Sequence, residues 1–160
     1  KEVLEFTQGK IKLNIELKPS DNGELLAKNT VRLIEKYNMV NDCVITSFSN
    51  SALQAVKSYN ENIKVGYILS AAYGDFYDMK NIDFFSINAA FLSKRTIDAI
   101  HNSGKRVYAW TVNNKESIKN LTNKGVDGII TDNPVLARET IYSRDTSETI
   151  VNMIRYVFNQ

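Results

Sequence analysis

Short runs of β-branched and aromatic residues recur along this 160-residue chain at nearly regular intervals. The runs cover residues 13–18, 43–48, 65–69, 84–88, 106–112 and 127–132, so their starts lie 30, 22, 19, 22 and 21 residues apart. Such an interval accommodates a strand, a helix and two short loops. No two-residue hairpin signal separates the runs. The pattern therefore predicts six parallel strand–helix units.

Helical patterns fill the intervals between these runs. We expect helices over residues 23–37, 52–59, 94–101, 115–123 and 134–142, and a tail helix over residues 147–158. Asn50 or Ser51 is expected to cap the second helix, and Ser93 and Asn114 the third and fourth. Pro134 suits the first turn of the fifth helix.

The repeated unit predicts an α/β fold with a parallel sheet, without deciding how the sheet closes. The sequence has no glycine-rich loop of the phosphate-binding or dinucleotide-binding kind. A (β/α)8 barrel takes about 250 residues and eight units, so six units amount to a partial TIM-type barrel. An open six-stranded sheet fits the spacing equally well. We expect one domain over residues 1–160, with its core in residues 11–142.

Composition excludes several classes of function. Twenty basic residues against 18 acidic ones give a net charge of +2, and neither kind forms a block, so we expect no nucleic-acid partner. A single cysteine cannot form an internal disulfide. We expect neither a signal peptide nor a membrane span in this sequence. The chain begins at Lys1 rather than Met, which suggests a piece of a longer protein.

Glu16 and Lys18 stand two residues apart near the end of the first predicted strand. They share one strand face with Asn14, while Ile15 and Leu17 take the apolar face. Parallel α/β proteins carry their sites at this end of the strands. A carboxylate there can bind a divalent cation, and an amine can neutralise a phosphate or form a Schiff base. A structural ion pair explains the spacing equally well.

Other residues give weaker signals. Trp110, the only tryptophan, either walls a pocket or belongs to the core. We expect Asp132 to cap the helix that Pro134 opens, and His101 to have a structural role near a helix end. Cys43 is expected in the core. The aromatic loop 70–81 either lines a pocket or folds back on a neighbouring helix.

Six motifs, in chain order, resemble those of the glycerophosphodiester phosphodiesterases: LNIELK, VITSF, GYIL, FFSIN, RVYAWTVN and GVDGIITDNP. The resemblance spans residues 12–134, and the last two motifs are specific in combination. Because that family folds as a (β/α)8 barrel, the runs correspond to about its third to eighth strands. The resemblance implies metal-assisted hydrolysis of a glycerophosphodiester substrate to glycerol 3-phosphate and an alcohol, with Ca2+ or Mg2+ as the cation.

The resemblance also implies roles for individual residues. Glu16 matches the metal-binding glutamate of the family's E-x-K motif. Lys18 matches the lysine beside the substrate phosphate, which makes Lys18 the catalytic candidate. Trp110 matches an aromatic residue of the substrate pocket, and we place Phe48, from the VITSF motif, in the same substrate-binding wall. The cation and Lys18 would offset the charge that develops on the phosphoryl oxygens.

The family's other motifs do not occur in this sequence: the His-Arg-Gly strand, the Glu-Asn-Thr, two further acidic ligands and the His-Asp. His101 matches neither histidine of the family's acid–base pair. We therefore expect a C-terminal barrel portion that lacks the first two units and is inactive by itself. Its open sheet edges would be covered by self-association or by pairing with the N-terminal part. The parent protein could carry an upstream membrane domain.

Two other functions remain open. The chain could be a non-catalytic module that binds a phosphate ligand or a protein, or a different barrel enzyme that uses Lys18 as a Schiff-base amine. We favour the phosphodiesterase because Glu16 and Lys18 are both in place. The sequence does not indicate the compartment, the alcohol group of the substrate or the metal.

Overall fold

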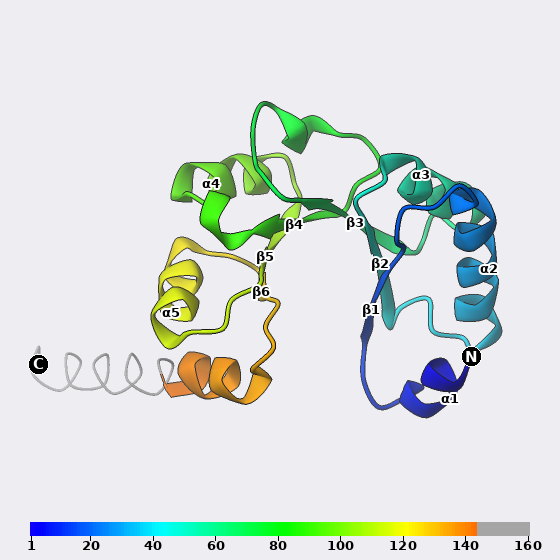
Figure 1. Cartoon of the computed structure of the whole chain (residues 1–160), viewed down its shortest axis with the longest axis horizontal. Helices are drawn as coiled ribbons and strands as arrows, with labels where there is room; N and C mark the ends of the chain where they lie inside the picture. The colour runs from blue at the N-terminus through cyan, green and yellow to red at the C-terminus, as the bar shows by residue number, and fades with distance from the viewer. Residues whose placement is uncertain (144–160) are drawn as a thin grey trace, which may run out of the picture.

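The computed structural model describes residues 1–143, and a curled sheet of six parallel strands forms its centre (Figure 1). The strands lie side by side in the order in which the chain visits them. They are β1 (Leu13–Glu16), β2 (Cys43–Ser47), β3 (Lys64–Leu69), β4 (Phe84–Asn88), β5 (Arg106–Trp110) and β6 (Gly128–Ile129). The sheet curls into half a barrel, which confirms the predicted partial TIM-type barrel against the open sheet.

Helices cover the outer side of the curled sheet (Figure 1). They are α2 (Gly23–Lys36), α3 (Asn50–Tyr59), α4 (Lys94–Asn102), α5 (Lys115–Lys124) and a helix over residues 134–143. A short helix that the strand spacing did not predict, α1 (Glu2–Thr7), precedes β1. The Tyr37 hydroxyl anchors α1 by donating to Glu5 Oε1 at 2.6 Å. The expected tail helix 147–158 lies outside the described residues.

The connection between β3 and β4 departs from the predicted strand–helix repeat. It contains only the 3-10 turn η1 (Phe76–Asp78), and a second turn, η2 (Ala89–Phe91), follows β4. The ring of Phe76 packs edge-on against buried Phe85 of β4, with centroids 5.0 Å apart. Loop 70–81 thus folds back on the sheet, where it covers the outer face that a helix covers elsewhere.

Polar side chains cap α3, α4, α5 and helix 134–143, with two departures from the expected caps. Ser93 and Asn114 cap α4 and α5 as predicted. Ser49, rather than Asn50 or Ser51, caps α3, because its hydroxyl accepts from the Ala52 N–H at 3.3 Å. Asn133 replaces Asp132 as the cap of helix 134–143; its side chain accepts from the Leu136 N–H at 3.2 Å.

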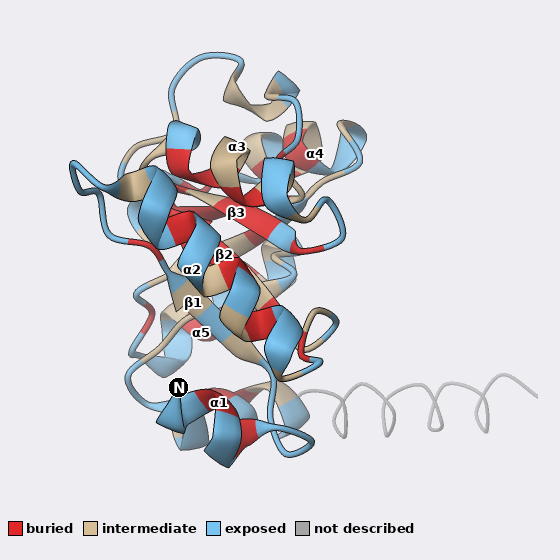
Figure 2. Ribbon diagram, turned by 90° about the vertical axis from the view of Figure 1, so that its right-hand side faces the viewer, coloured by how far each residue is buried: buried red, intermediate tan, exposed pale blue. Residues whose placement is uncertain are grey.

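The core lies between the sheet and its helices (Figure 2). Alternate strand residues point outward, where the helices and loop 70–81 bury them completely; they include Ile45, Val65, Phe85, Val107 and Ala109. The residues between them along each strand point into the hollow of the half-barrel. Phe84 is one of these inward residues, and a Cβ built on Gly66 of the next strand would lie 2.1 Å from its ring. Glycine at position 66 therefore makes room for the Phe84 ring.

Within the described residues, no helix has the length and apolar character needed to cross a membrane. The first, second, fifth and sixth strands end earlier than the sequence predicts, at Glu16, Ser47, Trp110 and Ile129. The residues that follow these strand ends therefore form loops at the carboxyl-terminal mouth of the half-barrel, where the predicted site residues gather. These loop residues are 17–18, 48, 111–112 and 130–132.

Candidate functional site

A cavity of about 320 Å³ opens on the inner side of the sheet at this mouth. Every site residue predicted from the sequence lies in its lining: Glu16, Lys18, Phe48 and Trp110. The other lining residues are Asn14, Thr46, Ile68, Ser86, Thr111 and Ile130. The fold brings these residues together because inward positions of neighbouring parallel strands meet in register.

Glu16 and Lys18 form an ion pair on the inner side of β1. Lys18 Nζ donates to Glu16 Oε1 at 2.7 Å, and the two side chains are 77% and 33% exposed. Both side chains lie on the inner face of β1 but remain in contact with solvent, because β1 is the first strand of the sheet. An exposed pair contributes about 0–1 kcal/mol, so either partner can exchange it for a ligand.

Two aromatic rings form the apolar wall of the cavity. The rings of Phe48 and Trp110 pack edge to face with centroids 6.2 Å apart and planes at 86°. The indole Nε1 of Trp110 donates to the Ser86 carbonyl at 2.9 Å, which fixes the ring against β4. Phe48 remains 40% exposed toward the cavity mouth.

Sequence reasoning missed three polar residues of the cavity: Thr46, Ser86 and Thr111. Thr46 and Ser86 are each 2% exposed, and the Thr46 hydroxyl donates to Asn14 Oδ1 at 3.0 Å. Their signal in the sequence was weak, because a buried hydroxyl needs only a hydrogen-bond partner, and Ser47 on the outward face of β2 is as buried as Thr46 and Ser86.

The structure places the remaining candidate residues away from the cavity. His101 Nε2 lies 2.9 Å from Asp127 Oδ2 on the outer side, which is consistent with the structural role expected for it. Cys43 is 2% exposed at the start of β2, and burial raises the pKa of its thiol. Asp132 accepts from Asn113 Nδ2 at 2.8 Å and takes no part in the helix cap.

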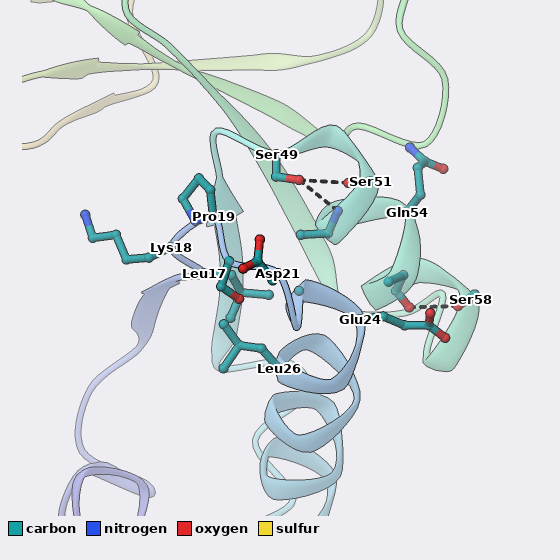
Figure 3. A pocket seen from close by; sticks show the side chains of 14 residues that line it. Leu17, Lys18, Pro19, Asp21, Glu24, Leu26, Ser49, Ser51, Gln54 and Ser58 are labelled. Carbon is teal, nitrogen blue, oxygen red and sulfur yellow. Dashed lines mark hydrogen bonds between the residues drawn. The ribbon is translucent and has the colours of Figure 1, made fainter.

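A second cavity, of about 480 Å³, lies at the rim between the starts of α2 and α3. Its polar lining includes Asp21, Glu24, Ser49 and Ser51 (Figure 3). Lys18 lines this cavity as well, with its side chain extending away from Asp21 and Glu24 (Figure 3). The hydroxyls of Ser49 and Ser51 are 2.9 Å apart and partner each other. The 320 Å³ cavity is the better candidate, because it alone contains Glu16 and the aromatic pair Phe48–Trp110.

The residues described here do not amount to a complete metal site. Among residues 1–143, no group of three or more His, Cys, Asp or Glu side chains could hold a metal ion. Glu16 is the one carboxylate in the cavity lining, and Asn14, Thr46, Ser86 and Thr111 add neutral oxygens. Ca2+ takes six to eight oxygen ligands, so these five oxygen-bearing side chains fall short of its shell.

Comparison with known proteins identifies the family. Residues 1–136 match the Glycerophosphoryl diester phosphodiesterase family. The chain belongs to this family. A glycerophosphodiester phosphodiesterase of Caldanaerobacter subterraneus subsp. tengcongensis is 25% identical over 133 residues, which are 81% of this chain and 49% of that protein.

Solved structures show the same family fold. A glycerophosphodiester phosphodiesterase from Parabacteroides distasonis matches with a TM-score of 0.79 and 19% identity, over 86% of this chain and 60% of that one. A phosphodiesterase from Oleispira antarctica, solved in complex with the product sn-glycerol-3-phosphate, matches with a TM-score of 0.74 and 26% identity, over 81% of this chain and 55% of that one. The chain thus spans roughly half the length of the relatives it matches.

Proposed function

We propose that this chain forms the phosphate-binding half of a glycerophosphodiester phosphodiesterase barrel. The observation that carries the proposal is the meeting of Lys18, Glu16 and the Phe48–Trp110 wall in one cavity of a chain that belongs to this family. A glycerophosphodiester has an anionic phosphate beside a small carbon skeleton. The cavity offers an ammonium group for the first and aromatic surface for the second.

Lys18 is the residue we assign to the phosphate. Its side chain is 77% exposed and its one polar partner among residues 1–143 is Glu16, so it can turn to a ligand without breaking the fold. An ammonium beside a phosphoryl group stabilises the negative charge that grows on the oxygens as the ester bond breaks. The exposure of Lys18 argues against its use as a Schiff-base amine, because that chemistry needs a desolvated or otherwise activated amine.

We assign Glu16 as one ligand of a divalent cation, Ca2+ or Mg2+, whose remaining ligands lie outside the residues described here. Its carboxylate is a hard oxygen donor and stands next to the proposed phosphate position. The family's metal supplies Lewis-acid stabilisation when it is bound. Because the chain's own residues hold only part of the shell, Lys18 and the aromatic wall are what this chain supplies by itself.

The chain by itself is proposed to be inactive. The described residues that line the cavity include no histidine, and their one carboxylate, Glu16, is the residue we assign to the cation. Proton transfer by positioned groups contributes typically 10²–10⁴-fold to such reactions. The same observation supports the alternative function, a non-catalytic module that binds a phosphate ligand.

A binding titration tests the proposed site directly. Trp110 is the only tryptophan, so its fluorescence reports on the cavity wall alone. We expect glycerol 3-phosphate to change Trp110 emission, and Lys18→Ala to weaken binding about tenfold or more. The matched control is Lys119→Ala, because Lys119 is an exposed residue of α5 that does not line the cavity. Equal affinity in the Lys18 and Lys119 variants would contradict the assignment of Lys18.

A hydrolysis assay separates the enzyme from the binding module. We would incubate glycerophosphocholine and glycerophosphoethanolamine with Ca2+ or Mg2+ and either this chain or a longer protein that contains it with an upstream barrel segment. Hydrolysis by the longer protein alone supports the proposal. Hydrolysis by the isolated chain contradicts the proposal that it is inactive. If both proteins bind the ligand and neither hydrolyses it, the non-catalytic binding module is favoured.

A further inference from the structure

The side chain of Asn113 joins the loops that follow β5 and β6. Its Oδ1 accepts hydrogen bonds from the Thr131 hydroxyl at 3.0 Å and from the Asp132 backbone N–H at 2.9 Å. Its Nδ2 donates to Asp132 Oδ2 at 2.8 Å. One carboxamide therefore makes three hydrogen bonds, all to residues 131 and 132.

These bonds lie where the hydrogen-bond ladder of the sheet comes to its end. β6 is 2 residues long, and β5 ends at Trp110. Beyond them, the Val112 N–H donates to the Ile130 carbonyl at 3.0 Å. Trp110, Thr111 and Ile130 line the cavity, and Asn113 does not. The Asn113 side chain thus lies just behind the segment that builds one cavity wall.

We propose that Asn113 is a positioning residue: by tying residues 111–113 to residues 131–132, it holds Trp110 and Thr111 in the cavity wall. Its effect on ligand affinity rests on the proposed function, whereas its effect on Trp110 rests on this geometry alone. Thr111, Asn113 and Asp132 are exposed, so packing contributes little to their placement. A carboxamide suits the position because it presents an acceptor and a donor together.

Three variants separate this role from general stability. Asn113→Ala removes all three hydrogen bonds, and Asn113→Asp sets a second carboxylate against Asp132. Asn113→Asp combined with Asp132→Asn reverses donor and acceptor and restores the bond. The matched control is Asn114→Ala at the next position, where Oδ1 accepts from the Ser117 N–H at 2.8 Å to cap α5. That variant loses a helix cap and leaves residues 131–132 untouched.

The deciding measurement is acrylamide quenching of Trp110 fluorescence in the whole chain. We expect the quenching constant to rise roughly twofold in Asn113→Ala and Asn113→Asp, because the loss of the hydrogen bonds to residues 131–132 lets the quencher reach Trp110 more often. It should match wild type in Asn114→Ala, even where the melting temperature falls equally, and return toward wild type in the double variant. Equal quenching in the Asn113 and Asn114 variants, or no recovery in the double variant, would overturn the proposal.

A titration with glycerol 3-phosphate extends the test to the ligand. We expect Asn113→Ala to weaken binding by about tenfold, the scale of lost hydrogen bonds and misplaced contacts, and Asn114→Ala to leave it unchanged. If Asn113→Ala binds like wild type, the residue does not position the ligand wall. If wild type itself does not bind, the proposed function fails, while the quenching result still decides the role of Asn113.

Discussion

Asp83 and Asp127 occupy equivalent positions in the sheet. The Asp83 carboxylate accepts from the Val65 N–H at 2.8 Å, and the Asp127 carboxylate accepts from the Val107 N–H at 2.8 Å. In both cases the backbone N–H of the aspartate returns a bond of 2.9 Å to the carbonyl of the same valine. Each aspartate therefore adds two hydrogen bonds at the amino-terminal end of a strand pair, β3–β4 and β5–β6, opposite the candidate site.

The Asp83 carboxylate makes stability depend on pH. Burial by itself would raise the pKa of Asp83, but hydrogen bonds from Lys57, the Val65 N–H and Lys64 outweigh it and hold the pKa below its ordinary value of 3.8. Because the folded pKa lies below the unfolded one, this contribution is present above the unfolded value and is lost as the pH falls through the folded value. Thermal melts at stepped pH should show stability falling as the pH drops from about 5 to below 3.8.

Asp83→Asn removes the charge that Lys57 faces. The Lys57 side chain is only 14% exposed, so we expect a loss of roughly 1–3 kcal/mol at pH 7 and a flatter acid limb. Asp98→Asn, which breaks an exposed pair with Lys94 on α4, is the control and should cost at most about 0.5 kcal/mol. Parallel acid limbs in wild type and Asp83→Asn would show that Asp83 does not carry this pH dependence.

Gly66→Ala tests the packing inside the half-barrel. The added Cβ would meet the Phe84 ring at 2.1 Å, and Phe84 is 3% exposed. We expect urea unfolding to show a loss of about 1–3 kcal/mol, the usual cost of overpacking. Gly23→Ala is the control, since nothing lies within 4 Å of its Cβ position. A Gly66 variant as stable as wild type would mean that the Phe84 ring moves aside freely.

Self-association through β1 is the prediction that bears on the open edge of the sheet. The Leu13 and Leu17 N–H groups bond toward β2, so the intervening Asn14 N–H points to the other side. We expect wild type to associate with rising concentration in sedimentation velocity, and Asn14→Pro to reduce that association because proline lacks the N–H. A monomer at every concentration in wild type would argue against edge pairing.

Cys43 gives a chemical probe of the core. Burial raises the pKa of its thiol, which is 2% exposed at the start of β2, so the reactive thiolate is scarce at neutral pH. We expect a thiol reagent to modify native protein far more slowly than protein in denaturant. Because this is the only cysteine, the rate reports one position. Rapid modification of the native protein would show that the start of β2 opens readily.

The sequence predicted the sheet and the gathering of the site because both follow from periodicity. Alternation in β1 put Asn14, Glu16 and Lys18 on one face, and the structure has all three in one cavity. The regular interval predicted parallel strands in chain order, and the structure has that order. These features need only the two-residue period of a strand and the length of a strand–helix unit.

Features that depend on competition between neighbours could not be predicted in the same way. Ser49, Asn50 and Ser51 are all good cap residues in a row, and backbone geometry alone decides that Ser49 bonds the Ala52 N–H. Asp132 does not cap helix 134–143, because its carboxylate accepts a hydrogen bond from Asn113, which precedes it by a whole helix and strand. The stretch of sequence between β3 and β4 is nearly as long as those between the other strands, yet it forms an aromatic loop instead of a helix. Phe76 of this loop covers Phe85, as a helix would elsewhere.

The agreement between strand order and chain order has a consequence for how this half-barrel folds. Each strand pairs only with the strands just before and after it, so the contacts between strands join segments about one strand–helix unit apart. We expect stability to be close to a sum over neighbouring units, as in repeat proteins, and folding to begin at an adjacent pair of strands. A unit gained or lost at an end alters one interface and leaves the register of the others unchanged.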